Sequence, residues 1–283
     1  MEAEKIYSNL ETDFIKSGLT DSWAHHMGDV VEFLTENFKQ RSMGLVCDFT
    51  NKIDRVYTAV FPSDLVMQKI LDDKVKNSLL FVHHPAIWDI RKSPQVFQQM
   101  NRKLLQQFKE RGISIYNLHV PLDNFSEYST SKTLADALGI KNLKPCSPYE
   151  GGLAGVIGET KCKTIKELQN VFEKAVGHRI KVHHYGDEKI VNGKVVVVAG
   201  GGNEVGYLKD AFDLGIKVVI TGIGSRNPYS EKDHKYEEKN GINVLGGTHY
   251  STEAFACIAM CKYFEKLGLK SEFIKDIPVM EDM

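Results

Sequence analysis

Short runs of β-branched and other apolar residues alternate with amphipathic segments along this chain, and this alternation strongly limits the folds it can adopt. Strand-length runs separated by helix-length segments are typical of α/β proteins, in which helices connect and cover the strands. We therefore predict an α/β fold. The predicted strands span residues 44–49, 56–61, 79–82, 113–117, 194–199, 218–221 and 242–245.

The segments between these strands have the apolar spacing of helices, and several begin at Ser or Thr and end at Gly. Residues 142–158 break the pattern with two prolines and four glycines, so we predict a connection between two halves of the chain. The polar residues 225–241 are predicted to form a surface loop, or alternatively a mobile lid. The predicted helices span residues 63–72, 94–111, 131–138, 164–176, 204–214 and 252–267.

The composition supports a globular protein and argues against several functional classes. The 283 residues are 42% apolar, and 36 basic against 37 acidic side chains provide no field that would attract nucleic acid or a membrane surface. No apolar stretch reaches the roughly 20 residues of a membrane span. The N-terminus does not resemble a signal peptide, so we expect a cytoplasmic protein. Five cysteines without Cys-x-x-Cys spacing predict neither a disulfide framework nor a thiolate zinc site.

Chemically useful side chains follow the predicted strands directly. The buried-strand pattern of residues 79–82 runs into His83 and His84, and Pro85 then stiffens the exit from the strand. In open α/β sheets, ligands bind at this carboxyl edge. Successive side chains of an extended segment point in opposite directions. The two imidazoles can therefore reach two different ions or splay around one.

The same arrangement recurs after two further strands. His119 and Asp123 follow the strand at 113–117, and His249 and Glu253 follow the strand at 242–245. The last two lie four residues apart, so they share one face if a helix begins near residue 248. Imidazoles mixed with carboxylates suit zinc, iron, manganese, cobalt or nickel, and the sequence leaves the identity of the metal open.

Other features of the sequence have more ordinary interpretations. His-His pairs also occur at residues 25–26 and 183–184, where a predicted helix and a predicted strand favour structural or surface roles. The glycine run at 200–202 follows a strand and precedes a helix, but it lacks the remaining residues of a dinucleotide fingerprint or a P-loop. A tight structural turn is the favoured interpretation of this run, with phosphate binding as the alternative.

Three ordered motifs together resemble a known family. They are Val-His-His-Pro at 82–85, Asn-Leu-His at 117–119 continuing to Asp-Asn at 123–124, and Gly-Thr-His-Tyr-Ser-Thr-Glu at 247–253. Their sequence is similar to that of the Nif-three-like dinuclear metal-centre family, often named GTP cyclohydrolase 1 type 2. The chain departs from the family at Ile223, where an acidic residue is common, and residues 37–44 match its N-terminal motif poorly.

The resemblance implies a site, a cofactor and an assembly. It implies two divalent metal ions per chain and a homo-oligomer, a hexameric ring with the metal sites facing an internal cavity. It also implies one domain over residues 1–283, without a large inserted domain. Two similar α/β halves, about 1–145 and 159–283, would pack together with the metal site between them, at the C-terminal ends of strands. The implied metal ligands are His83, His84, Asp123, His249 and Glu253, with His119 beside the site as a catalytic candidate.

The expected function follows from that site and has one main alternative. Our leading hypothesis is a metal-dependent hydrolase of the GTP cyclohydrolase type, acting on a nucleotide or a related heterocycle as its small-molecule substrate. The alternative is a non-catalytic metal carrier or regulatory protein. A third hypothesis gives the metals a purely structural role. No nucleic-acid partner is expected.

Overall fold

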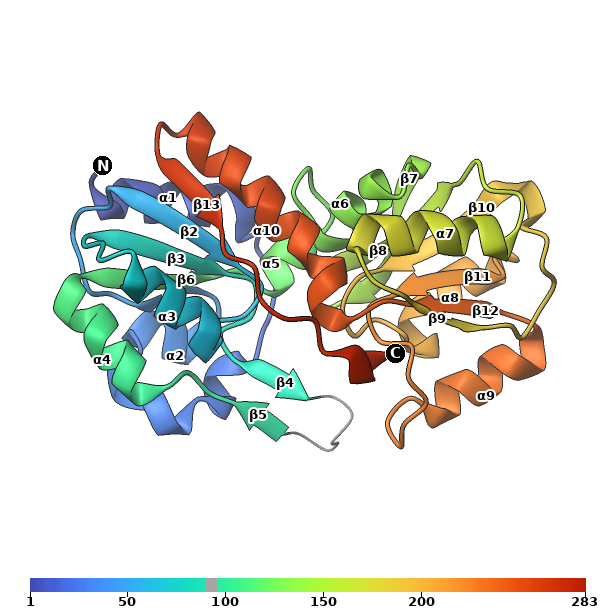
Figure 1. The fold of residues 1–283 in the computed structure, drawn as a ribbon, viewed down its shortest axis with the longest axis horizontal. Helices are drawn as coiled ribbons and strands as arrows, with labels where there is room; N and C mark the ends of the chain where they lie inside the picture. The colour runs from blue at the N-terminus through green and yellow to red at the C-terminus, as the bar shows by residue number, and fades with distance from the viewer. Residues whose placement is uncertain (90–95) are drawn as a thin grey trace. The chain divides into compact units, whose positions relative to one another are not determined.

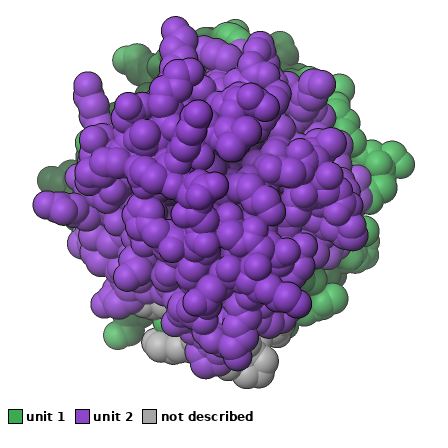
Figure 2. Space-filling model, turned by 90° about the vertical axis from the view of Figure 1, so that its right-hand side faces the viewer, with its two compact units in different colours: residues 1–89, 95–122, 257–276 green, residues 90–94, 123–256, 277–283 purple. Residues whose placement is uncertain are grey.

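Two compact α/β units make up the chain, and the C-terminal part of the sequence contributes to both. The computed structural model describes residues 1–89 and 96–283. Unit 1 comprises residues 1–89, 95–122 and 257–276, and unit 2 comprises residues 90–94, 123–256 and 277–283 (Figure 2). The prediction of an α/β fold is confirmed.

A five-stranded sheet lies at the centre of unit 1, within the described residues (Figure 1). Strand β3 occupies the middle and pairs in parallel with β6 on one side and β2 on the other. Strand β1 pairs antiparallel with β6, and β13 pairs in parallel with β2. In sheet order the strands are β1 (Gly44–Cys47), β6 (Ile113–Asn117), β3 (Ser78–Val82), β2 (Arg55–Ala59) and β13 (Lys270–Phe273).

Helices cover both faces of this sheet. One face packs its apolar side chains against α2 (Glu36–Arg41), α3 (Asp64–Asp72), α4 (Arg102–Arg111) and the 3-10 turns Trp23–His26 and Gly28–Phe33. The other face contacts α1 (Ala3–Phe14) and the second half of α10 (His249–Lys266), for example through Phe81 against Phe264 at 5.6 Å between ring centroids. A sheet buried on both faces explains why its strands read as continuous apolar runs.

Unit 2 is built around a six-stranded sheet, again within the described residues. Side chains alternate along its strands: Val195 and Val197 of β10 pack towards α6 and α7, whereas Val196 and Val198 pack towards α8. In sheet order the strands are β7 (Lys141–Tyr149), β8 (Gly152–Glu159), β10 (Lys194–Val198), β11 (Val218–Thr221), β12 (Asn243–Gly246) and β9 (Lys181–His183). The helices are α6 (Thr130–Ala137), α7 (Ile165–Val176), α8 (Val205–Asp213) and α9 (Glu231–Asn240).

Three predicted segments differ from the structure. Residues 142–158 form most of the antiparallel β7–β8 hairpin instead of a loose connection. The glycines there permit close approach between strands, since a Cβ on Gly155 would lie 2.5 Å from Ser147 Oγ. Both prolines lie on β7, an edge strand, where a missing N–H is tolerated. The predicted loop at 225–241 contains α9, so the loop interpretation was wrong for residues 231–240.

The third difference is the helix predicted at 94–111. Residues 96–98 form β5, which pairs with β4 (Ile87–Asp89), and α4 begins only at Arg102. The side chain of Asn101 caps this helix by accepting a hydrogen bond from Lys103 N at 3.0 Å. Positions 94 and 95 lie outside the described residues. All five cysteines are free thiols in the structure.

Candidate metal centre

The strand end of β3 holds two adjacent histidines. The backbone N–H groups of His83 and His84 donate to the carbonyl oxygens of Ala59 and Val60 at 3.2 and 2.9 Å, which extends the parallel β2–β3 pairing beyond the strand. Both histidines are almost completely buried, with exposed fractions of 0% and 2%. Their ring centroids lie 4.2 Å apart. The central position of β3 therefore fixes the backbone from which both rings project.

His119 completes a cluster of three imidazoles in unit 1. Ring nitrogens of His83, His84 and His119, one from each residue, lie within 4.8 Å of one another. The imidazole nitrogens of His83 and His84 suit a divalent transition-metal ion, and His119 lies beside them. The Nδ1 of His83 lies 2.9 Å from the carbonyl oxygen of Leu118. Because a carbonyl only accepts, the proton is on Nδ1, and Nε2 of the neutral ring carries the lone pair that a metal needs.

A buried carboxylate orients His119. Asp21 Oδ2 lies 3.0 Å from His119 Nδ1, and the Asp21 side chain is only 4% exposed. The same oxygen accepts a longer hydrogen bond, of 3.5 Å, from Val120 N. The carboxylate therefore accepts the Nδ1 proton and directs the basic Nε2 of the neutral ring away from itself. Sequence analysis missed Asp21 because it lies 98 residues from its partner in an irregular segment.

Aromatic rings enclose the same cluster. Trp23 meets His84 and His119 edge-on, with ring centroids at 5.3 and 5.4 Å, and Phe61 stacks on His84 at 5.0 Å. Such packing restricts rotation of the imidazoles and limits the access of water. Trp23 is 5% exposed and lies two residues after Asp21, so one short N-terminal segment supplies both supports.

In unit 2, His249 and Glu253 form a second candidate ligand pair. They lie in the first turns of α10, and His249 Nε2 is 3.0 Å from Glu253 Oε1. Their side chains are 8% and 4% exposed. The start of this helix is capped from the C-terminal tail, since Asp282 Oδ2 accepts a hydrogen bond from His249 N at 3.0 Å. The predicted sharing of one helix face is confirmed by this contact.

The glycine run packs tightly against this pair. Gly200 has φ +66°, and its N–H donates to Thr252 Oγ1 at 3.0 Å. A Cβ at Gly200 would lie 2.0 Å from Glu253 Oε1 and 3.2 Å from His249 Cδ2. Both observations support the interpretation of a tight structural turn.

Asp123 ends α5 (Val120–Asp123) and also belongs to unit 2. Its Oδ1 accepts a hydrogen bond of 2.6 Å from Thr130 Oγ1. Hydrogen-bonded carboxylates of this kind are common among metal ligands. The five predicted ligands are thus divided between units, with two in unit 1 and three in unit 2. That all five converge on one pair of ions stays a prediction.

A further polar cluster in unit 2 was not predicted. His234 and Glu237 of α9 are fully buried, with 3.2 Å between Nδ1 and Oε2. Tyr185 Oη lies 3.3 Å from the Nδ1 atoms of both His183 and His234. Burial raises the pKa of Glu237, against the lowering effect of His234, and burial lowers the pKa of His183. His183 Nε2 also lies 2.6 Å from the carbonyl oxygen of Gly224, and the structural role of His183 stays a prediction.

Comparison with known proteins indicates the family of this fold. A family model described as Duf34/NIF3 (NGG1p interacting factor 3) matches residues 27–278. A Pyrococcus horikoshii protein named GTP cyclohydrolase 1 type 2 homolog is 28% identical over 225 residues, covering 78% of this chain and 85% of that protein. A Deinococcus radiodurans protein with the same name is 26% identical, covering 82% of this chain and 83% of that protein.

Solved structures share the fold along almost the whole chain. The protein ybgI, described as having unknown function, aligns with a TM-score of 0.76 at 21% identity, covering 99% of this chain and 100% of that one. Reduced HcgD from Methanocaldococcus jannaschii aligns with a TM-score of 0.69 at 24% identity, covering 98% of both chains. Among the described residues, no helix is both long and apolar enough to cross a bilayer.

Proposed function

Because the chain belongs to the DUF34/NIF3 family, we propose that it is a divalent-metal-dependent hydrolase acting on a nucleotide or a related nitrogen heterocycle. The observation that carries this proposal is the buried cluster of His83, His84 and His119, with the Asp21 carboxylate behind His119. The names of the relatives, homologues of a GTP cyclohydrolase, support the choice of substrate class.

The donor atoms fit a pair of transition-metal ions. We assign His83, His84, Asp123, His249 and Glu253 as the ligands, two divalent ions per chain as the cofactor, and zinc, iron, manganese, cobalt or nickel as the candidates. Bound there, two such ions would polarise the bond under attack and lower the pKa of a bound water. The fixed Nδ1–H of His83 and the capped start of α10 hold ligand side chains in position before any ion arrives.

The residues of the chain would orient the substrate and move the proton. We assign His119 as the catalytic base, since Asp21 holds its Nδ1 proton and the Nε2 atom of the neutral ring can accept a proton from water. Asp21 then stabilises the imidazolium that forms, and the same ring returns the proton to the leaving nitrogen. Trp23 keeps the ring in place and excludes bulk water from one side.

Elemental analysis and turnover assays on the same samples test this proposal. We expect about two transition-metal ions per chain in the wild type, and loss of metal together with hydrolysis of GTP or a related nucleotide in His83→Ala. His184→Ala is the matched control, because His184 belongs to another His-His pair and is exposed. Metal retained without turnover on any nucleotide would favour the carrier or regulatory alternative. Absence of metal from the wild type would refute the site.

The expected assembly belongs to the same proposal. We propose a homohexamer, the ring expected from the family resemblance, and we expect a mass of six chains of 31.9 kDa in light scattering after size exclusion. A monomer at micromolar concentration would contradict this assembly without affecting the assignment of the metal ligands.

A further inference from the structure

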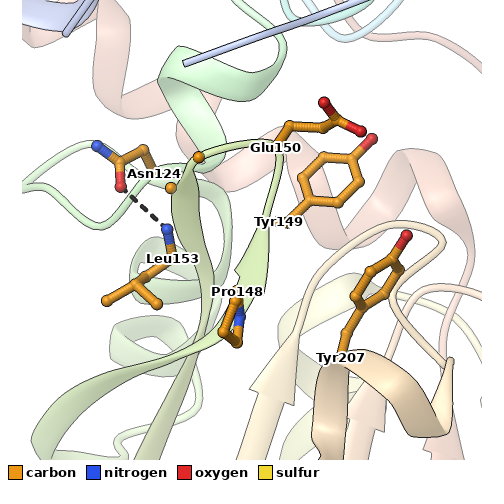
Figure 3. Close-up of a pocket in the computed structure, with 8 residues that line it drawn as sticks. Asn124, Pro148, Tyr149, Glu150, Leu153 and Tyr207 are labelled. Carbon is orange, nitrogen blue, oxygen red and sulfur yellow. Dashed lines mark hydrogen bonds between the residues drawn. The ribbon is translucent and has the colours of Figure 1, made fainter. Parts of the chain in front are cut away.

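A cavity of about 590 Å³ opens beside the β7–β8 turn of unit 2, well within the size range of small-molecule sites (Figure 3). Two tyrosines line it, Tyr149 at the end of β7 and Tyr207 in the first turn of α8. The turn residues and the residue after Asp123 complete its wall. The lining residues are Asn124, Pro148, Tyr149, Glu150, Gly151, Gly152, Leu153 and Tyr207.

The two tyrosine rings form an aromatic corner. Their centroids lie 5.5 Å apart with an interplanar angle of 77°, so the edge of one ring meets the face of the other. An edge-to-face pair leaves ring surface on which a planar ligand can stack. Figure 3 shows the two hydroxyl groups and the Glu150 carboxylate directed to the same end of the cavity. Burial is the main cause that raises the pKa of Tyr207, followed by the charges of Glu204 and then Glu150.

Glu150 adopts a backbone conformation that its side chain does not favour. Tyr149 pairs with Gly152, so Glu150 and Gly151 form a two-residue hairpin turn, with φ of +45° and +84°. Turns with positive φ at both positions strongly prefer Asn, Asp or Gly at the first. A glutamate there costs conformational energy.

The cavity is also joined to the segment that carries a proposed metal ligand. Asn124 follows Asp123 directly, and its Oδ1 accepts a hydrogen bond of 3.1 Å from Leu153 N. The backbone pair Phe125 N and Leu153 O, 3.0 Å apart, reinforces this attachment. The hairpin and the Asp123 segment are therefore held to each other by two hydrogen bonds.

We propose that this cavity binds a planar nitrogen heterocycle of the guanine type, which stacks on Tyr207, meets Tyr149 with its edge and donates adjacent N–H groups to the Glu150 carboxylate. A carboxylate accepts two parallel N–H bonds, which selects rings bearing an amino group next to a ring N–H. This inference rests on the proposed function, since it specifies which heterocycle the same chain recognises.

The test compares binding of guanosine monophosphate with binding of inosine monophosphate, which lacks the amino group. We expect isothermal titration of the metal-loaded wild type to show tighter binding of the guanine nucleotide by about tenfold. Tyr207→Ala should weaken binding of both nucleotides at least about fivefold, and Tyr207→Phe should retain it. Tyr236→Ala is the control, because Tyr236 is a partly exposed tyrosine of the same unit that stacks on Phe212 outside the cavity.

Glu150→Asn separates recognition from folding. Asparagine tolerates positive φ, so this variant should melt at a higher temperature than the wild type while losing the preference for guanine over inosine. Equal affinities of wild type and Tyr207→Ala would overturn the inference. So would an unchanged guanine preference in Glu150→Asn.

The inference and the proposed function fail in different ways. Binding with guanine preference in His83→Ala, together with no turnover in the wild type, would support the cavity and reject the hydrolase. Turnover of nucleotides that is unaffected by Tyr207→Ala and Glu150→Asn would support the hydrolase and reject the cavity as its recognition site.

Discussion

Gly200 and Glu253 are in such close contact that no side chain fits between them: a Cβ on Gly200 would lie 2.0 Å from Glu253 Oε1. The turn after β10 therefore packs directly against the side chain of a proposed metal ligand. The carboxylate is confined between this turn and His249, whose Nε2 lies 3.0 Å away. This relationship couples the backbone of one strand end to the position of a side chain 53 residues later.

Gly200→Ala should therefore destabilise the fold and displace Glu253. The positive φ costs about 1–2 kcal/mol for alanine, and overpacking adds roughly 1–3 kcal/mol. Gly215→Ala is the matched control, because Gly215 has φ +76° with no atom within 4 Å of a Cβ, so it isolates the backbone cost. Denaturant unfolding of both variants measures the difference. Equal losses would show that Gly200 matters only for its backbone conformation.

Asp21→Asn should reduce turnover without removing metal. The amide keeps the shape of the carboxylate but loses the charge that stabilises protonated His119, so we expect a loss of about 100-fold in kcat. Asp29→Asn, at an exposed aspartate of the same unit, is the control. An unchanged kcat in Asp21→Asn would argue against His119 as the base.

Glu237→Gln should leave the protein at least as stable as the wild type at neutral pH. Burial raises the pKa of Glu237, and Asp233 adds to this effect while His234 and Asn203 oppose it. The folded state therefore binds the proton more tightly than the unfolded state. The stabilising contribution of the Glu237 carboxyl group is therefore full below its unfolded-state pKa of about 4.5. This contribution is lost as pH rises through its folded-state pKa.

Glutamine resembles the protonated acid, so the variant should avoid that loss of stability at neutral pH. Thermal melting between pH 4 and pH 8 would show this difference, because Tm should change less with pH in the variant than in the wild type. Glu238→Gln, at the exposed neighbouring position on α9, should follow the wild type. A destabilised Glu237→Gln would mean that the folded protein needs the ionised carboxylate of Glu237.

Removal of metal should lower thermal stability reversibly. Ions that bind only the folded chain stabilise it by mass action, by about 2.7 kcal/mol when free metal exceeds Kd a hundredfold. Chelation followed by calorimetry should lower Tm, and addition of zinc or manganese should restore it. His83→Ala should show a reduced response to the chelator. An identical response in wild type and variant would place the stabilising ion elsewhere.

The sequence alone identified most of what is local in this protein. Periodicity and position at the end of a strand revealed features that depend only on neighbouring residues. These are the buried run of β3, the histidines that follow it, and the i, i+4 spacing of His249 and Glu253. The strands β3, β6, β10 and β11 were found close to their observed bounds for the same reason.

Only the tertiary structure decided the long-range relationships. Three such relationships join residues far apart in the chain. Asp21 orients His119, Gly200 packs against Glu253, and β13 belongs to the sheet of unit 1. The β7–β8 hairpin was missed because its glycines and prolines read as breakers. The structural reason for these residues depends on the paired strands. The prolines are tolerated because β7 is an edge strand, and the glycines are required where the two strands approach closely.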